Sequence, residues 1–130
     1  MFRLNRLLCI VALLPMMASP VALAAWELDG ERSSLHFIST KNAAIAETHS
    51  FDKLTGSVSE QGDGVLQITL DSIETLIPIR NERMRKMLFE TAEFPLGTVR
   101  TSVDTAELDR ARAGEVVTTE LALRIDLHGV

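Results

Sequence analysis

The sequence is poor in aromatic residues and in cysteine: of its 130 residues none is tyrosine, one is tryptophan and one is cysteine. Surfaces that bind single-stranded nucleic acids rely on stacked aromatic side chains, so this shortage argues against such a partner. The single cysteine, Cys9, follows Leu8 inside an apolar run and lacks the small preceding residues that lipoprotein processing requires. No intramolecular disulfide can form, and stability must come from an ordinary core.

Positive charge is also scarce, because 13 basic residues stand against 18 acidic ones and the formal net charge is −5. An acidic domain is repelled by phosphate backbones and by anionic lipid surfaces. We therefore expect no nucleic-acid partner, no peripheral binding to membranes and no stable membrane insertion of the mature protein.

The N-terminal segment has the three-part layout of a secretory signal peptide. Two arginines precede an apolar run over residues 7–17, and Ala22 and Ala24 have the spacing that a signal peptidase reads. The run is shorter than the roughly 20 residues that cross a bilayer. We expect residues 1–24 to be removed in export and residues 25–130 to act in the periplasm as one domain without any cysteine.

Catalytic and metal-binding motifs are lacking as well. No G-x-S-x-G sequence is present, and neighbours such as His49 and Ser50 would point to opposite faces of a strand. The other histidines, His36 and His128, show none of the short spacings that mark metal sites. We expect no enzymatic activity, no metal and no cofactor.

What is present is alternation of apolar and polar residues, the pattern of half-buried strands. It is cleanest at Leu66, Ile68 and Leu70, after a turn signal at residues 62–64. Strands are expected over about residues 26–40, 45–59, 66–70, 99–103 and 121–127. The charged stretch 107–115 is interpreted as a connection.

One short helix is predicted around residues 81–90. Met84, Met87 and Leu88 stand at i, i+3 and i+4, which places them on one helical face. Asn81 is a suitable N-cap, and Pro95 ends the segment. The chain is thus expected to be mainly β, with one helix.

The last predicted strand runs almost to Val130 without a turn behind it. An apolar strand left at an open edge is a liability. We therefore expect the domain to lack its last strands in this chain, as a C-terminally incomplete member of its fold.

Ordered segments along the chain resemble the YceI-like family. The opening segments are Trp26-Glu27-Leu28-Asp29, Ser33-Ser34-Leu35-His36-Phe37 and His49-Ser50-Phe51. A more specific block follows with Asp71-Ser72-Ile73-Glu74-Thr75, Arg80-Asn81-Glu82-Arg83-Met84, Glu93-Phe94-Pro95 and the closing Leu127-His128-Gly129-Val130. The chain departs from the family pattern at two places. Many members have Arg-Asp followed by a His where this chain has Arg80-Asn81-Glu82-Arg83. The family's usual glycine ahead of the second-strand phenylalanine is replaced here by Glu47-Thr48.

The resemblance implies an antiparallel, lipocalin-like β-barrel in the periplasm that holds an isoprenoid lipid or a quinone tail in its interior. The tail would lie among apolar residues of the strands and the helix, and the head group near two arginines at the helix N-terminus. The predicted ligand-binding residues are Phe37, Phe51, Leu70, Ile73, Arg80, Arg83, Met84, Met87, Leu123 and Ile125.

Each of these assignments has a structural alternative. The apolar set could simply be a packed core, and the arginines, with Arg85 and Lys86, a solvated helix face. The alternative function is a structural or interaction protein whose barrel is filled by its own side chains and holds no ligand. A homodimer is left open.

Overall fold

The computed structural model describes residues 24–130. The predicted signal peptide, residues 1–24, lies almost wholly outside the described residues, and its cleavage stays a prediction. Among the described residues, no helix is long and apolar enough to cross a bilayer.

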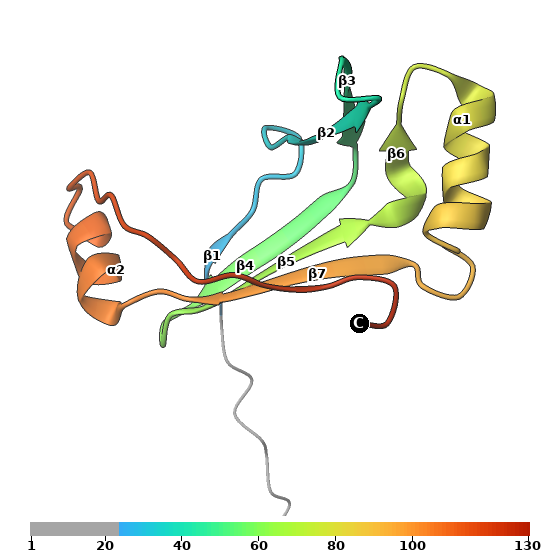
Figure 1. The fold of residues 1–130 in the computed structure, drawn as a ribbon. Coiled ribbons are helices and arrows are strands. Elements are labelled where there is room, and N and C mark those ends of the chain that lie inside the picture. Colours follow the sequence, from blue (N-terminus) through green and yellow to red (C-terminus); the bar gives the residue numbers. More distant parts are fainter. Residues whose placement is uncertain (1–23) are drawn as a thin grey trace, which may run out of the picture.

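A five-stranded antiparallel sheet forms the body of the structure (Figure 1). Its strands in spatial order are β1 (Ala24–Glu27), β4 (Leu54–Ser59), β5 (Asp63–Thr69), β7 (Leu96–Ser102) and β8 (Arg124–Asp126). The central pair β5–β7 stays in register from Asp63↔Ser102 to Thr69↔Leu96. The predicted alternation at residues 66–70 thus belongs to the centre of this sheet.

A second, three-stranded sheet consists of β2 (Leu35–Lys41), β3 (Ile45–Phe51) and β6 (Ile73–Glu74). The β2–β3 hairpin closes through a turn in which Asn42 and Ala43 both have positive φ angles, 52° and 55°. A turn whose two central residues have positive φ angles suits the twist of a hairpin. This sheet rises from one end of the larger one (Figure 1).

Two strands that were expected from the sequence pattern are each divided by a turn in the structure. The expected strand 26–40 is two strands, because Asp29 folds the chain back by accepting hydrogen bonds from the backbone of Glu31 and Arg32. The expected strand 45–59 is also two strands, divided at Asp52 and Lys53. A 3₁₀ turn, η1 (Leu70–Ser72), makes the matching corner from β5 to β6.

The predicted helix is present but begins earlier. Helix α1 (Pro78–Arg83) has proline in its first turn, and it continues into a π-helical turn, η2 (Met84–Leu88). Asn81 therefore lies inside the helix, and its assignment as the N-cap is wrong. Ile77 is the N-cap and supplies no side-chain hydrogen bond.

A second helix, α2 (Thr105–Arg112), replaces the connection that was expected over residues 107–115. Asp104 caps it by accepting a hydrogen bond from the Ala106 backbone at 2.8 Å. The expected strand over residues 121–127 is reduced to the three residues of β8, which pair with Thr98–Arg100 of β7.

The core lies where the two sheets and the first helix meet. Its buried members are Phe51, Leu54, Leu70, Ile73 and Phe89. Leu70 and Ile73, on either side of the η1 corner, are 1% exposed. Over residues 24–130 the two sheets do not close into a barrel.

Candidate functional site

One face of the larger sheet is apolar across all of its strands. Directly opposite residues on paired strands point to the same face, so the register defines its rows. The first row is Leu54, Ile68 and Gly97; the second is Gly56, Leu66, Val99 and Ile125; the third is Val58, Gly64 and Thr101. Because Leu54 belongs to the buried core, this face looks toward the second sheet.

The larger of two grooves on this face has a volume of about 860 Å³. Both sheets, the end of the helix and the C-terminal segment contribute to it. Its lining residues are Leu35, His36, Phe37, Phe51, Ile68, Leu70, Leu88, Phe89, Gly97, Ile125, Leu127, His128 and Val130.

The smaller groove, about 410 Å³, continues along the same face toward β1. Its lining residues are Trp26, Glu27, Leu28, Gly56, Ser57, Val58, Gly64, Val65, Leu66, Val99, Thr101 and Leu123. Ile125 of the larger groove pairs directly with Val99 of the smaller one, so the two grooves border each other within the second row. We call the two bordering grooves together the apolar trough.

Glycines in the floor keep this trough open. Gly56, Gly64 and Gly97 stand on the apolar face of three neighbouring strands, although glycine weakens a strand interior. A Cβ atom at Gly97 would lie 3.4 Å from both Leu70 and Leu127, and one at Gly64 would lie 2.7 Å from the Thr101 methyl. Any larger side chain at Gly97 would therefore take up space in the larger groove.

Aromatic rings form one wall of the larger groove. The rings of Phe37 and Phe51 stack with centroids 5.5 Å apart, and Phe51 meets Phe89 edge-on at 5.7 Å. These rings come from β2, β3 and the residue that follows the π turn. Aromatic side chains offer large, rigid apolar surfaces, and this wall ties the hairpin to the helix.

The helix arginines take up different positions. The Arg80 guanidinium donates to both carboxylate oxygens of Glu47, at 2.9 and 2.8 Å, and to the Thr75 carbonyl at 2.8 Å. The side-chain hydrogen bonding from Arg80 lowers the pKa of the Glu47 carboxyl below its usual range. Arg83 is exposed, and within residues 24–130 it makes no ion pair.

The other two cations on the helix are held by neighbours. Arg85 donates to the Asp71 carbonyl at 2.7 Å, which ties the helix to the η1 corner, so it is not simply a solvated side chain. Lys86 pairs with Glu82 at 2.6 Å on the exposed surface.

The structure brings four of the ten predicted ligand residues into the larger groove: Phe37, Phe51, Leu70 and Ile125. Leu123 lines the smaller groove, and Met84 packs against the core beneath. Ile73 is buried and lines neither groove, while Met87 is 79% exposed. Contact of any of these residues with a ligand stays a prediction.

Several lining residues were missed from the sequence, among them Trp26, Leu28, Leu35, Phe89 and Leu127. Leu28, Leu35 and Leu127 carried a signal, since they stand at apolar positions of alternating segments. Phe89 belongs to the segments that resemble the family but had no periodicity signal, because the π turn places it and no periodicity predicts a π turn.

A buried polar network supports the start of the helix. The Asn81 carboxamide oxygen accepts hydrogen bonds from the Thr75 backbone, at 2.9 Å, and from its hydroxyl, at 2.5 Å. The Asn81 amide donates to Glu74 at 3.0 Å, and this bond lowers the pKa of Glu74. The network fixes the turn between β6 and α1.

The histidines do not join a catalytic or metal-binding group in the part of the chain that the structure describes. His49 Nε2 lies 2.9 Å from the Ser39 hydroxyl, whereas Ser50 donates to Asp52, so His49 and Ser50 are not paired. His128 contacts Glu90 at 2.6 Å. Residues 24–130 contain no cluster of three or more metal-ligating side chains.

Comparison with known proteins places this geometry in a family. The sequence profile of the YceI-like domain matches residues 26–130. A search of curated proteins gives no match. Among solved structures, a polyisoprenoid binding domain from Saccharophagus degradans, described as implicated in plant cell wall breakdown, is 42% identical with a TM-score of 0.73.

That alignment covers 83% of this chain and 62% of the solved domain, so the chain spans less than two thirds of the relative's length. The mainly antiparallel sheets with two short helices agree with this likeness. Since the family profile covers nearly all of the described residues, the chain belongs to the YceI-like family.

Proposed function

We propose that the protein binds the hydrocarbon tail of an isoprenoid lipid or quinone in the apolar trough, without catalysing a reaction. The observation that carries the proposal is the continuous apolar face with its two bordering grooves. Ligand sites commonly have volumes of about 300–1,000 Å³ and mostly apolar walls. The polyisoprenoid-binding relative supports the choice of an isoprenoid.

The energetics suit a long tail. Burial of one methylene contributes about 0.8 kcal/mol, so ten of them give on the order of 8 kcal/mol. Part of that offsets the loss of motion on binding. Micromolar or tighter affinity is the expected outcome for a tail that fills both grooves.

The tail would contact Phe37, Phe51, Leu70 and Ile125 in the larger groove and Leu123 in the smaller one. The proposal does not require Arg80 and Arg83 to contact the lipid head group, because the Arg80 guanidinium is already hydrogen-bonded to the Glu47 carboxylate. The periplasm remains the proposed location, on the strength of the predicted signal peptide alone. The alternative, an interior filled by the protein's own side chains without a ligand, is decided by the extraction experiment below.

The test is solvent extraction of the purified protein followed by mass spectrometry, on the wild type and on Gly97→Val. Valine suits a strand and adds its methyl groups to the groove floor, so the variant should recover much less isoprenoid lipid. Thr98→Val on the same strand points to the opposite face and is the control. Absence of lipid from several wild-type preparations, or equal recovery from Gly97→Val, would contradict the proposal.

A further inference from the structure

The loop between β6 and α1 presents apolar side chains to solvent. Leu76 is 87% exposed, Ile79 is 57% exposed, and Ile77 and Pro78 between them are exposed as well. Scattered exposed apolar residues are ordinary, but four in succession at one tip are not. We call Leu76, Ile77, Pro78 and Ile79 the apolar loop.

The apolar loop is held in a conformation that its own sequence disfavours. Leu76 has φ 62°, in the left-handed region that leucine rarely adopts. Its backbone N–H donates to the Glu74 carboxylate at 2.5 Å, and the adjacent Thr75 is fixed by buried Asn81. Such strain persists only where surrounding contacts impose it, and it concentrates at functional places. The network thus keeps Leu76 projecting outward rather than letting it fold onto the core.

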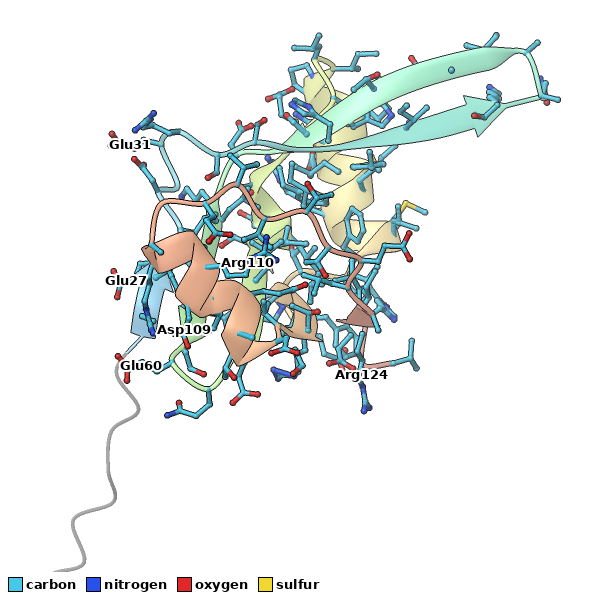
Figure 2. The ribbon with its side chains drawn as sticks, turned by 90° about the vertical axis from the view of Figure 1, so that its left-hand side faces the viewer. Glu27, Glu31, Glu60, Asp109, Arg110 and Arg124 are labelled. Atoms are coloured by element: carbon cyan, nitrogen blue, oxygen red, sulfur yellow. The ribbon has the colours of Figure 1, made fainter. Side chains whose placement is uncertain are left out.

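A second apolar tip stands at the same end of the molecule. The turn of the β2–β3 hairpin contains exposed Ala43, Ala44 and Ile45. Both this turn and the apolar loop lie near the top in Figure 1, and Figure 2 shows the hairpin reaching sideways, away from α1, so that the two tips stand apart. Two separate protrusions that reach one level suit a broad, flat partner better than a narrow groove.

The surface near the apolar loop and the hairpin turn carries exposed cations, although the chain as a whole is acidic. Lys41 beside the hairpin turn and Arg83, four residues after Ile79 on the helix, are exposed cations, and neither makes an ion pair within residues 24–130. Glu47 and Glu82 are paired with Arg80 and Lys86, whereas Glu74 is hydrogen-bonded to the neutral amide of Asn81 and keeps its negative charge. The two unpaired cations at this end therefore outnumber the one carboxylate without a cationic partner, that of Glu74.

Acidic side chains gather at the other end. Figure 2 shows Glu27, Glu31, Glu60 and Asp109, with Arg110 among them, around β1 and α2, and Figure 1 shows α2 at the opposite end from α1. Arg112 pairs with Glu60 and Asp109, so Glu27 and Glu31 are the acids of this group without an ion pair among the described residues. Interactions between exposed charges farther apart than a Debye length, about 8 Å at physiological salt, are largely screened. The net charge of −5 thus does not describe the surface around the apolar loop.

From these observations we infer that the apolar loop and the hairpin turn dock the protein on a phospholipid bilayer containing anionic lipids. Shallow insertion of a few apolar side chains beside cations is the way proteins lie on a membrane without crossing it. The inference goes beyond the proposed function and does not depend on which lipid the trough holds. It does connect with it, since the docked helix continues to Leu88 and Phe89 in the groove wall.

The test is flotation with vesicles of phosphatidylcholine containing a minor fraction of phosphatidylglycerol. The full chain is expressed and purified in the form that cells produce, so any retained N-terminal segment is common to all variants. The double variant Leu76→Asn, Ile79→Gln should float roughly tenfold less than wild type, since two apolar anchors are lost. Asparagine tolerates the positive φ angle and glutamine suits a helix, so the fold is retained.

The matched control is Val116→Asn, which alters a side chain that is 92% exposed but lies outside both tips. It should float like wild type. Lys41→Glu should reduce flotation by roughly fivefold with phosphatidylglycerol and have little effect without it. Wild type that fails to float, or a double variant that floats equally well, overturns the docking inference.

Lipid extraction from the same variants separates this inference from the proposed function. A double variant that no longer floats but still carries isoprenoid has lost docking alone. Failure to recover lipid from a wild type that floats would contradict the proposed function and leave the docking surface in place.

Discussion

Asn81 illustrates how a single polar side chain can determine local structure from inside the core. With His49 and Thr75 it is one of the buried polar residues among those described. Its carboxamide joins β6 to α1 through hydrogen bonds to Thr75 and Glu74. The sequence predicted that Asn81 would be an N-cap, a role that also relies on hydrogen bonds to the backbone. It did not predict that Asn81 is buried, because its burial depends on packing against the second sheet.

Replacement of Asn81 by leucine should lower the free energy of unfolding by about 1–3 kcal/mol. The Thr75 N–H and hydroxyl would lose their buried acceptor. Urea denaturation measures the change, and Gln67→Leu on an exposed strand position should shift stability by no more than about 0.5 kcal/mol. A stable Asn81→Leu protein would show that the network contributes little.

Acid should destabilise the fold through carboxylates with lowered pKa values. The Arg80 hydrogen bond lowers the pKa of Glu47, and the Asn81 hydrogen bond lowers that of Glu74, both from 4.5. A lowered folded-state pKa gives stability that is present above the unfolded value and lost as the pH falls through the folded one. Urea midpoints should therefore drop below pH 4.5.

Glu47→Gln tests this assignment. The variant should be less stable than wild type near neutral pH, and its urea midpoint should fall less steeply in acid, because the titrating carboxylate is gone. Midpoints that run parallel to those of wild type across the whole pH range would show that Glu47 does not contribute to the acid transition.

At the scale of elements, the alternation of apolar and polar residues predicted the strands, but the sequence did not predict the turns that divide them. Leu66, Ile68 and Leu70 indicated the centre of the larger sheet because one face of β5 is buried. The corners at Asp29 and Asp52 were missed because apolar residues continue on both sides of them. The helix α2 was missed because Leu108 is its one buried residue, although Asp104 followed by Glu107 resembles a capping signal.

Loss of the Asp104 cap should weaken α2. Asp104→Ala removes the acceptor for the Ala106 N–H, at a cost of about 0.5–2 kcal/mol. Because the helix packs mainly through Leu108, the loss should appear as local fraying, measured by amide hydrogen exchange over residues 105–112. Thr105→Ala, an exposed change one residue later, should leave exchange nearly unaltered.

At the scale of the whole molecule, the trough depends on pairings that no local pattern contains. Gly97 is distant in sequence from Gly56 and Gly64, and only the β5–β7 register places it on the same floor. The family resemblance predicted an apolar interior, and five of the ten predicted residues line one of the two grooves. Arg80 was harder to predict because its partner Glu47 comes from another sheet.

Trp26 provides a direct reporter of the trough, since it is the single tryptophan of the chain and lines the smaller groove. Lipid-free protein titrated with a long-tailed quinone should show saturable quenching of Trp26 fluorescence, with a micromolar or tighter Kd. Gly97→Val should weaken the binding, and a quinone without a tail should give no saturation. Quenching that is identical with and without the tail would contradict the account.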